Sequence, residues 1–194
     1  MTLFRANDRH PVDPRILIIK DMDEFNLWRE RAKLGIHGIV CDYPAPMETL
    51  QEAAQHIARV FPGTSNTFSY PYGSAEETRL ILENHGIVGD AQDILVRLSD
   101  IFVNTADLET LPQNSSNRLR IDSAYPDDFH IHHETLAFAF SQMGMICRTG
   151  GKDETGHEYP IKVGQVAYID DTIWHKAPQW DASWEDNPRI NLVM

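Results

Sequence analysis

The chain has 194 residues, of which 42% are hydrophobic and 24% charged, a balance typical of a folded protein and too apolar for a disordered one. Its 17 Lys and Arg against 29 Asp and Glu give a formal net charge of −12, so we expect neither nucleic acid nor a membrane surface as a partner. The sequence shows no signal or transit peptide pattern and no apolar run of the ~18 residues that a membrane span needs, which predicts a cytoplasmic protein.

The length suits one domain, 1–194, whose first part, 1–110, we expect to be mainly helical with one or two strands. Short runs rich in Ile and Val, bounded by Gly and Pro, predict strands at 16–20 and 35–44. Apolar residues spaced three and four apart predict helices over 22–34, 46–61, 75–87 and 90–104. Asp21 or Asp23 is a candidate N-cap for the first helix, and Ser74 with Glu77 forms a capping box at the third.

The segment 64–74 has the composition of a turn-rich break, and 105–117 that of a polar linker. After the linker, short segments rich in Ile, Val, Phe and Thr alternate with turn sequences such as AYPDD and EDNP. This pattern predicts an α+β fold in which 111–194 forms an antiparallel sandwich or barrel, with the helices as an N-terminal layer.

A histidine cluster stands inside this predicted β core, in the stretch FHIHHETLAFAF at 129–140. On a strand, side chains alternate between faces, so His130, His132 and Glu134 would share one face and His133 would point the other way. If no bulge interrupts the strand, Leu136, Phe138 and Phe140 would continue the first face as an apolar wall. Such a wall makes two buried imidazoles costly unless a metal binds them.

Residues four apart on a strand are separated by ~13 Å, so His130 and Glu134 are not expected to bind the same metal ion. Either one or the other would be the second ligand beside His132. His175, in TIWHKAP, is the candidate third ligand, because it alone among the later histidines has an apolar, strand-like setting. We therefore predict a metal site of His130, His132 and His175, with Glu134 as the alternative second ligand in place of His130. The competing interpretation is a polar strand end with no chemistry.

HIHHETLAFAFSQMG resembles the first cupin motif, with Gly144 twelve residues after His132, and GQVAYIDDTIWH resembles the second, with Gly164 eleven residues before His175. The resemblance implies a cupin-like jelly roll, the double-stranded β-helix. Asp170 and Thr172 replace a Pro and a Gly of the second motif, and no glutamate stands at the motif's fourth-ligand position. This departure favours three ligands over four. Asp170 and Asp171 are candidates to orient a ligand imidazole through its second nitrogen, with a role as turn residues as the equal alternative.

About the last hundred residues are also similar to the bacterial domain of unknown function 1826 family. RLRIDSAYPDDFHIH, QMG, WHKAP and PRINLVM stand in the order of that family's pattern, with the family's HxD replaced by His130-Ile-His132. His132-His133-Glu134, His175 and, fourteen residues later, Arg189 stand in the order HxD/E, His, Arg. In this the chain further resembles the 2-oxoglutarate oxygenases, which share the double-stranded β-helix and use these residues. That resemblance implies Arg189 as a cofactor contact, with Arg148 as an equal candidate for the anion and a structural ion pair as the alternative.

The expected function is that of a mononuclear non-haem Fe(II)-dependent oxygenase acting on a small molecule, because neutral imidazoles arranged on one side of the ion leave positions open and suit Fe(II). 2-Oxoglutarate is a candidate co-substrate, and a homodimer a candidate assembly. Two alternatives stay open: a Zn-dependent hydrolase or lyase, and a non-catalytic cupin-like binding or sensing module. Cys41 and Cys147, each in a strand-like segment, are expected to be buried thiols.

Overall fold

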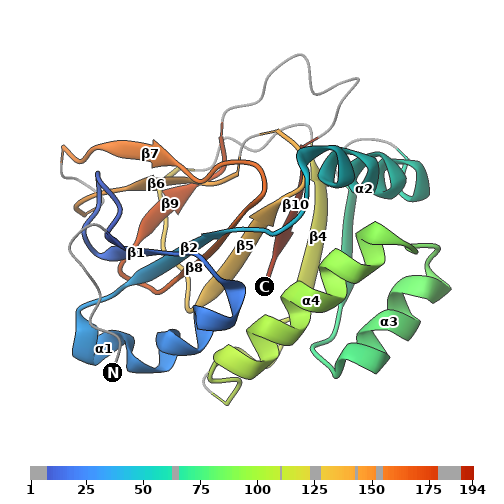
Figure 1. Cartoon of the computed structure of the whole chain (residues 1–194), viewed down its shortest axis with the longest axis horizontal. Helices are drawn as coiled ribbons and strands as arrows, with labels where there is room; N and C mark the ends of the chain where they lie inside the picture. Colours follow the sequence, from blue (N-terminus) through green and yellow to red (C-terminus); the bar gives the residue numbers. More distant parts are fainter. Residues whose placement is uncertain are drawn as a thin grey trace.

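The computed structural model describes residues 8–62, 66–109, 111–122, 128–142, 144–151, 155–178 and 189–194. Within these ranges the strands form a seven-stranded and a three-stranded sheet, and the larger sheet has the order β1-β2-β8-β5-β10-β4-β3 (Figure 1). Its strands are β1 (Ile16–Ile19), β2 (Gly38–Asp42), β3 (Asn66–Tyr70), β4 (Asn117–Asp122), β5 (Thr135–Ala139), β8 (Gln165–Ile169) and β10 (Arg189–Val193). All neighbours in it are antiparallel except β1 and β2, which run parallel.

The smaller sheet has the order β7-β6-β9 and faces strands β1, β2, β8 and β5 of the larger one. Its strands are β6 (Ile146–Arg148), β7 (Glu158–Pro160) and β9 (Trp174–Lys176). Buried apolar side chains from both sheets pack in one cluster between them, including Val40 and Ile169 from the larger sheet and Cys147 and Tyr159 from the smaller. Two sheets closed over a common apolar core form a jelly roll, as the sequence predicted.

The helical segments are the 3-10 helix η2 (Met22–Glu30), α1 (Arg31–Leu34), α2 (Met47–Val60), α3 (Ala75–Asn84) and α4 (Asp90–Thr105). Two of them begin where their caps predict: Asp21 and Glu24 form a capping box at η2, and Ser74 and Glu77 form one at α3. The four predicted helices are thus confirmed in position. The first differs in kind, because most of it is a 3-10 helix.

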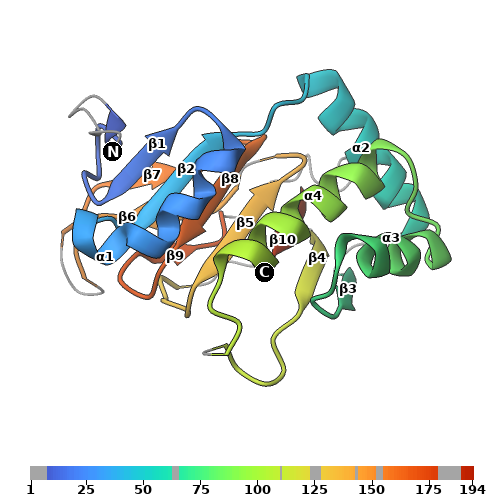
Figure 2. The same ribbon diagram turned by 60° about the horizontal axis from the view of Figure 1, so that its bottom comes forward.

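The outer face of the larger sheet is covered by helices, and the continuous segment of η2 and α1 lies across it together with α4 in Figure 2. Tyr168 of β8 is central to this contact, with ring centroids 4.4 Å from Trp28 of η2 and 5.8 Å from Phe102 of α4. Leu136 and Phe138 of β5 belong to the same buried cluster. The larger sheet is therefore apolar on its helix-covered face, and over β1, β2, β8 and β5 it is also apolar on the face toward the smaller sheet. A polar site in this fold is expected at the open edge between the sheets.

Two expectations about the strands are wrong. The turn-rich break at 64–74 contains a strand, β3, whose polar residues Asn66, Thr67 and Ser69 hide the strand pattern, while 64 and 65 lie outside the described residues. β1, β2 and β3 all come from the first part of the chain, where one or two strands were expected, and all join the larger sheet. No helix within the described ranges is long and apolar enough to cross a membrane.

Candidate metal centre

Backbone pairing between two distant segments positions the first two histidines. The amide of His130 donates to the carbonyl of His175 at 2.9 Å, and the amide of His175 donates back to the carbonyl of His130 at 3.0 Å. This isolated bridge extends the smaller sheet beyond β9. Residues that exchange both hydrogen bonds in an antiparallel pair lie directly opposite each other, so both imidazoles stand on one face of the sheet.

His132 completes a group of three imidazoles. The ring centroid of His130 lies 4.6 Å from that of His132 and 4.7 Å from that of His175, and the remaining pair is 5.3 Å apart. One ring nitrogen from each residue can be chosen so that all three lie within 4.8 Å of one another. This separation lets three nitrogens face a single ion at bonding distance. The structure thus brings His130, His132 and His175 together.

Backbone carbonyls fix the orientation of two of the rings. Nδ1 of His130 lies 2.8 Å from the Asp128 carbonyl, and Nδ1 of His175 lies 3.1 Å from the Ile173 carbonyl. Because a carbonyl only accepts, each Nδ1 carries the proton and each Nε2 keeps its lone pair. A hydrogen bond of this kind behind the ring is the usual support of a metal-bound histidine. Asp170, the predicted support, instead lies 2.9 Å from Nδ1 of His37.

The three rings differ in exposure. His175 is buried, His130 is half-buried and His132 is exposed. Burial lowers the pKa of His175 to about 4; the hydrogen bond to Ile173 opposes this shift, and the neighbouring His130 and His132 add to it. His175 is therefore a neutral imidazole at physiological pH, which is the form that binds metal.

Glu134 lies away from this group. Its carboxylate forms an ion pair with Arg31 and accepts a hydrogen bond of 3.2 Å from the Tyr168 hydroxyl. Both partners belong to the helix-covered side of the larger sheet, where Tyr168 is buried. The expectation that Glu134 shares a face with His130 and His132 is wrong, because 131–134 are outside any strand and β5 begins only at Thr135.

The same break changes which side chains of β5 face the site. Leu136, Phe138 and Phe140 pack in the cluster under the helices, so the expectation that they extend the histidine face is wrong. Thr135, Ala137 and Ala139 line the cavity at the histidines, although Phe138 also reaches its wall. Because the side chains facing the cavity are small, space remains between the sheets.

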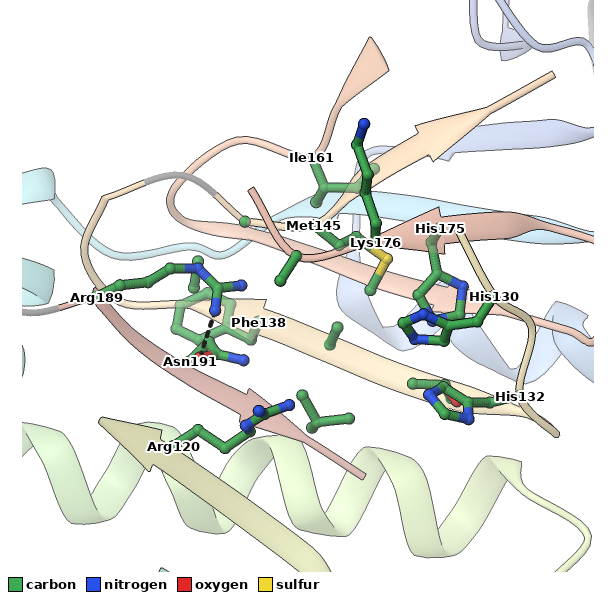
Figure 3. A pocket seen from close by; sticks show the side chains of 16 residues that line it. Arg120, His130, His132, Phe138, Met145, Ile161, His175, Lys176, Arg189 and Asn191 are labelled. Carbon is green, nitrogen blue, oxygen red and sulfur yellow. Dashed lines mark hydrogen bonds between the residues drawn. The ribbon is translucent and has the colours of Figure 1, made fainter. Parts of the chain in front are cut away.

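This cavity has a volume of about 70 Å³ and is lined by the three histidines together with Arg189, Arg120 and Lys176. In Figure 3, Arg189 and Arg120 reach in from the larger sheet toward one end, and the imidazoles lie at the other. No aspartate or glutamate lines it within the part of the chain that the structure describes. Lys176 has a counterion of its own, since its Nζ lies 3.3 Å from the Glu158 carboxylate.

Arg189 is buried, and its Nη1 donates to Oδ1 of Asn191 at 3.0 Å. Asn191 lies two residues along the same strand, so both side chains point to the cavity face. Arg148, the other candidate for an anion contact, does not line this cavity; its guanidinium lies 5.1 Å from the centroid of the Phe129 ring. The structure therefore places Arg189, and not Arg148, in the same cavity as the histidines.

Arg120 and Asn191 are cavity residues that the sequence analysis missed. Arg120 belongs to β4 and stands opposite Asn191 in the register of β4 and β10. The alternation of RLRID was a usable signal, because Arg118 and Arg120 must share one face of any strand there. Which face it is depends on the pairing with β10, and the sequence does not contain that information in readable form.

Each cupin-like glycine has a local reason in the structure. A Cβ on Gly144 would lie 2.5 Å from the carbonyl oxygen of Ile161, far inside van der Waals contact. Gly164 has φ of +76°, a backbone conformation that side chains disfavour.

Cys147 is fully buried, and burial raises its pKa to about 12, so it is a packing residue and not a nucleophile.

No family model and no curated protein matches the sequence. Among solved structures, the chain is similar to dioxygenase for auxin oxidation 1 from Arabidopsis thaliana in its binary complex with 2-oxoglutarate, at 10% identity and a TM-score of 0.50, covering 92% of this chain and 90% of that one. The rice dioxygenase for auxin oxidation is 11% identical with a TM-score of 0.48, and the match covers 89% of this chain and 76% of that one. An oxidoreductase of the 2OG-Fe(II) oxygenase family from Burkholderia pseudomallei is 11% identical with a TM-score of 0.47, and the match covers 91% of this chain and 92% of that one.

At this identity the likeness to the Arabidopsis dioxygenase is a likeness of fold. It spans nearly the whole of both chains, so the double-stranded β-helix core predicted from the cupin-like motifs is confirmed. Any functional conclusion depends on the cavity itself: three converging imidazoles at one end and two arginines at the other.

Proposed function

We propose that this protein is a mononuclear non-haem Fe(II)-dependent oxygenase acting on a small molecule, with the metal held by His130, His132 and His175. The observation that carries the proposal is the convergence of three imidazoles in a cavity that also contains a buried arginine. Three neutral nitrogen donors on one side of an ion leave its other positions open, which suits Fe(II). When bound there, Fe(II) would supply the activation of dioxygen.

The protein's own residues fit that ion. The Asp128 and Ile173 carbonyls hold the rings of His130 and His175 with Nε2 available, so little reorganisation is needed for binding. His175 is neutral because it is buried, so no proton has to leave before it binds metal. The larger sheet, sealed by helices on its far side, excludes water from the cavity floor.

We further propose that Arg189 binds the distal carboxylate of a 2-oxo acid, with 2-oxoglutarate as the candidate. Its guanidinium presents paired N–H donors that match a carboxylate, and Asn191 holds it in place. The Arabidopsis dioxygenase of like fold was solved with 2-oxoglutarate, which supports this choice of co-substrate. The cytoplasmic location, the homodimer and membership of the domain of unknown function 1826 family stay predictions.

One experiment tests metal and co-substrate together. Protein loaded with Fe(II) without oxygen should develop a visible charge-transfer band when 2-oxoglutarate is added. Arg189→Met should keep the iron and lose the band at moderate 2-oxoglutarate concentrations, whereas Arg148→Met, which removes the rival arginine, should keep both. Iron binding without any band in the wild type would refute the 2-oxoglutarate proposal, and a protein that binds no iron would refute the oxygenase.

A zinc enzyme is the second candidate, because three histidines without a carboxylate are also a ligand set of catalytic Zn²⁺. Such an enzyme would activate a bound water for hydrolysis or elimination. Metal analysis of protein purified without added ions separates the two candidates. Zinc at one equivalent, retained when Fe(II) is offered, would favour the hydrolase or lyase.

A further inference from the structure

A second cavity, of about 220 Å³, adjoins the first. The two share His132, Thr135 and Val193 as wall residues, so a molecule could extend from one into the other past His132. Segment 111–118 and residues 132–135 form most of the outer wall. We call the cavity of Arg189 the inner cavity and this one the outer cavity.

Strand register orders the arginines along the two cavities. Arg189, Asn191 and Val193 are alternate residues of β10, and they run from the inner cavity to the wall shared with the outer one. On β4, Arg120 lies opposite Asn191, and Arg118 lies opposite Val193. Directly opposed residues share a face of the sheet, so Arg120 stands between Arg189 on the inner side and Arg118 on the outer side.

We propose that Arg120 holds the carboxylate of the primary substrate, which is therefore a small organic acid whose body extends past Val193 into the outer cavity. This inference rests on the proposed function, in which Arg189 takes the carboxylate of the 2-oxo acid. Arg189 is already oriented by Asn191, whose amide lies between the two guanidinium groups in Figure 3. The two arginines thus provide separate positions for two carboxylates from two molecules.

Charge supports an anionic substrate. Among the described residues that line either cavity, Glu134 is the one carboxylate, and it forms an ion pair with Arg31. Arg118, Arg120 and Arg189 gather on one sheet face in a chain whose net charge is −12. Arg120 and Arg189 are diagonal neighbours, ~7 to 8 Å apart at the backbone, so each guanidinium can meet a carboxylate of its own.

The walls of the outer cavity suit the rest of such an acid. Tyr72, Leu111 and Met194 offer apolar surface, and Ser115 and Ser116 offer hydroxyl groups at the rim. Arg118 is exposed beside them, where it attracts an acid before Arg120 binds it. A carboxylate on an apolar body of moderate size matches this arrangement.

The test compares an acid with its neutral isostere. Fe(II)-loaded protein saturated with 2-oxoglutarate is titrated without oxygen in a calorimeter with phenylacetate and, separately, with phenylacetamide. A charge-assisted contact with Arg120 predicts that the acid binds about tenfold more tightly than the amide. Arg120→Met should remove this preference and leave the affinity for 2-oxoglutarate unchanged. Arg189→Met should weaken 2-oxoglutarate and, in titrations without it, keep the preference for the acid.

Two further variants control the result. Arg59→Met removes one positive charge from an exposed position on α2 and should change neither affinity. Arg120→Lys keeps the charge without the paired donors, so it should reduce the preference without removing it, and it serves if the methionine variant does not fold.

The proposal is wrong if the wild type binds phenylacetate no more tightly than its amide, or if Arg120→Met weakens 2-oxoglutarate as much as Arg189→Met does. The second result would assign both arginines to one dicarboxylate. The same titrations with metal-free protein keep the two proposals apart. A chain that binds no iron but prefers the acid through Arg120 would refute the oxygenase and retain the anion site.

Discussion

His132 has a different environment from the other two histidines. It is exposed, it forms part of the wall of both cavities, and it is two residues from Glu134, the predicted alternative to His130 as its partner ligand. His130 and His175 are joined by backbone hydrogen bonds and would stay close even without a metal. His132 supplies the third nitrogen of the group, so we expect the metal affinity of the site to depend on this residue.

We therefore expect His132→Ala to lower the affinity for Fe(II) by more than the ~10- to 100-fold that loss of a group supporting a ligand costs. Glu134→Gln should keep the metal, because Glu134 faces Arg31 and Tyr168, and should instead lower the melting temperature. Iron content after anaerobic loading and gel filtration measures the first effect. Metal retained in His132→Ala and lost in Glu134→Gln would show that the glutamate is the ligand.

The sequence indicated the three histidines and Arg189 because their order and spacing match motifs that the chain resembles. It did not predict Arg120 or Asn191, although both line the same cavity. An arginine in RLRID has many ordinary explanations, and its role depends on a strand partner about seventy residues later. A polar residue can be assigned to a site from sequence when its neighbours along the chain define the site, and not when its neighbours across a sheet do.

At the scale of elements, the alternation rule failed where the strand before β5 is interrupted. A period of two fixes the face of each side chain as long as the strand is continuous, and any interruption resets it. Here 131–134 interrupt it, so Glu134 turns toward Arg31 and the small odd-numbered residues of β5 face the cavity. The caps of η2 and α3 were predictable, because both partners of each capping box lie within four residues.

Gly144 shows how closely the connection after β5 approaches the smaller sheet. Its amide donates to the Ile161 carbonyl at 3.1 Å, and a Cβ would meet that same oxygen at 2.5 Å. We expect Gly144→Ala to cost about 1 to 3 kcal/mol in the free energy of unfolding, because the obstacle is backbone. Gly38→Ala is the matched comparison, since its nearest atom is a side-chain carbon of Ile16 at 3.0 Å.

Urea unfolding of the two variants gives the comparison directly. The cost of Gly144→Ala should exceed that of Gly38→Ala, because side chains can shift by rotation whereas the Ile161 carbonyl is held between two sheet segments. Equal costs would mean that the connection moves freely and that the cupin-like glycine has no packing role here.

At the scale of the whole molecule, the N-terminal strands were the feature that sequence reasoning placed least well. β1 and β2 were predicted as strands, but as strands of a mainly helical part, yet they extend the same sheet that carries Arg189. Pairing between β2 and β8 joins residues more than a hundred positions apart, and local patterns contain no record of such a partner. The site is therefore supported by the full length of the chain and not by its last hundred residues alone.

Asp13 ties these distant parts together. Its carboxylate is buried and accepts hydrogen bonds from Nη2 of Arg15 at 2.7 Å, Nε of Arg15 at 2.9 Å and the hydroxyl of Tyr159 at 2.9 Å. Tyr159 belongs to β7, and Arg15 also donates to the Thr172 carbonyl at 3.3 Å, just before β9. One carboxylate thus links the start of β1 to the smaller sheet, which carries two of the histidines.

Burial raises the pKa of Asp13, but the hydrogen bonds from Arg15 and Tyr159 outweigh it and hold the pKa below the usual value for that carboxyl. A group whose pKa is lower in the folded state stabilises the fold above its unfolded pKa and loses that contribution as the pH falls through the folded one. We expect Asp13→Asn to cost about 2 kcal/mol at neutral pH and to flatten the loss of melting temperature below about pH 4. Melting curves across that range check this, with Asp171→Asn, an exposed position, as the control. Parallel curves for wild type and Asp13→Asn would mean that the carboxylate is not the link between the N-terminal strands and the smaller sheet.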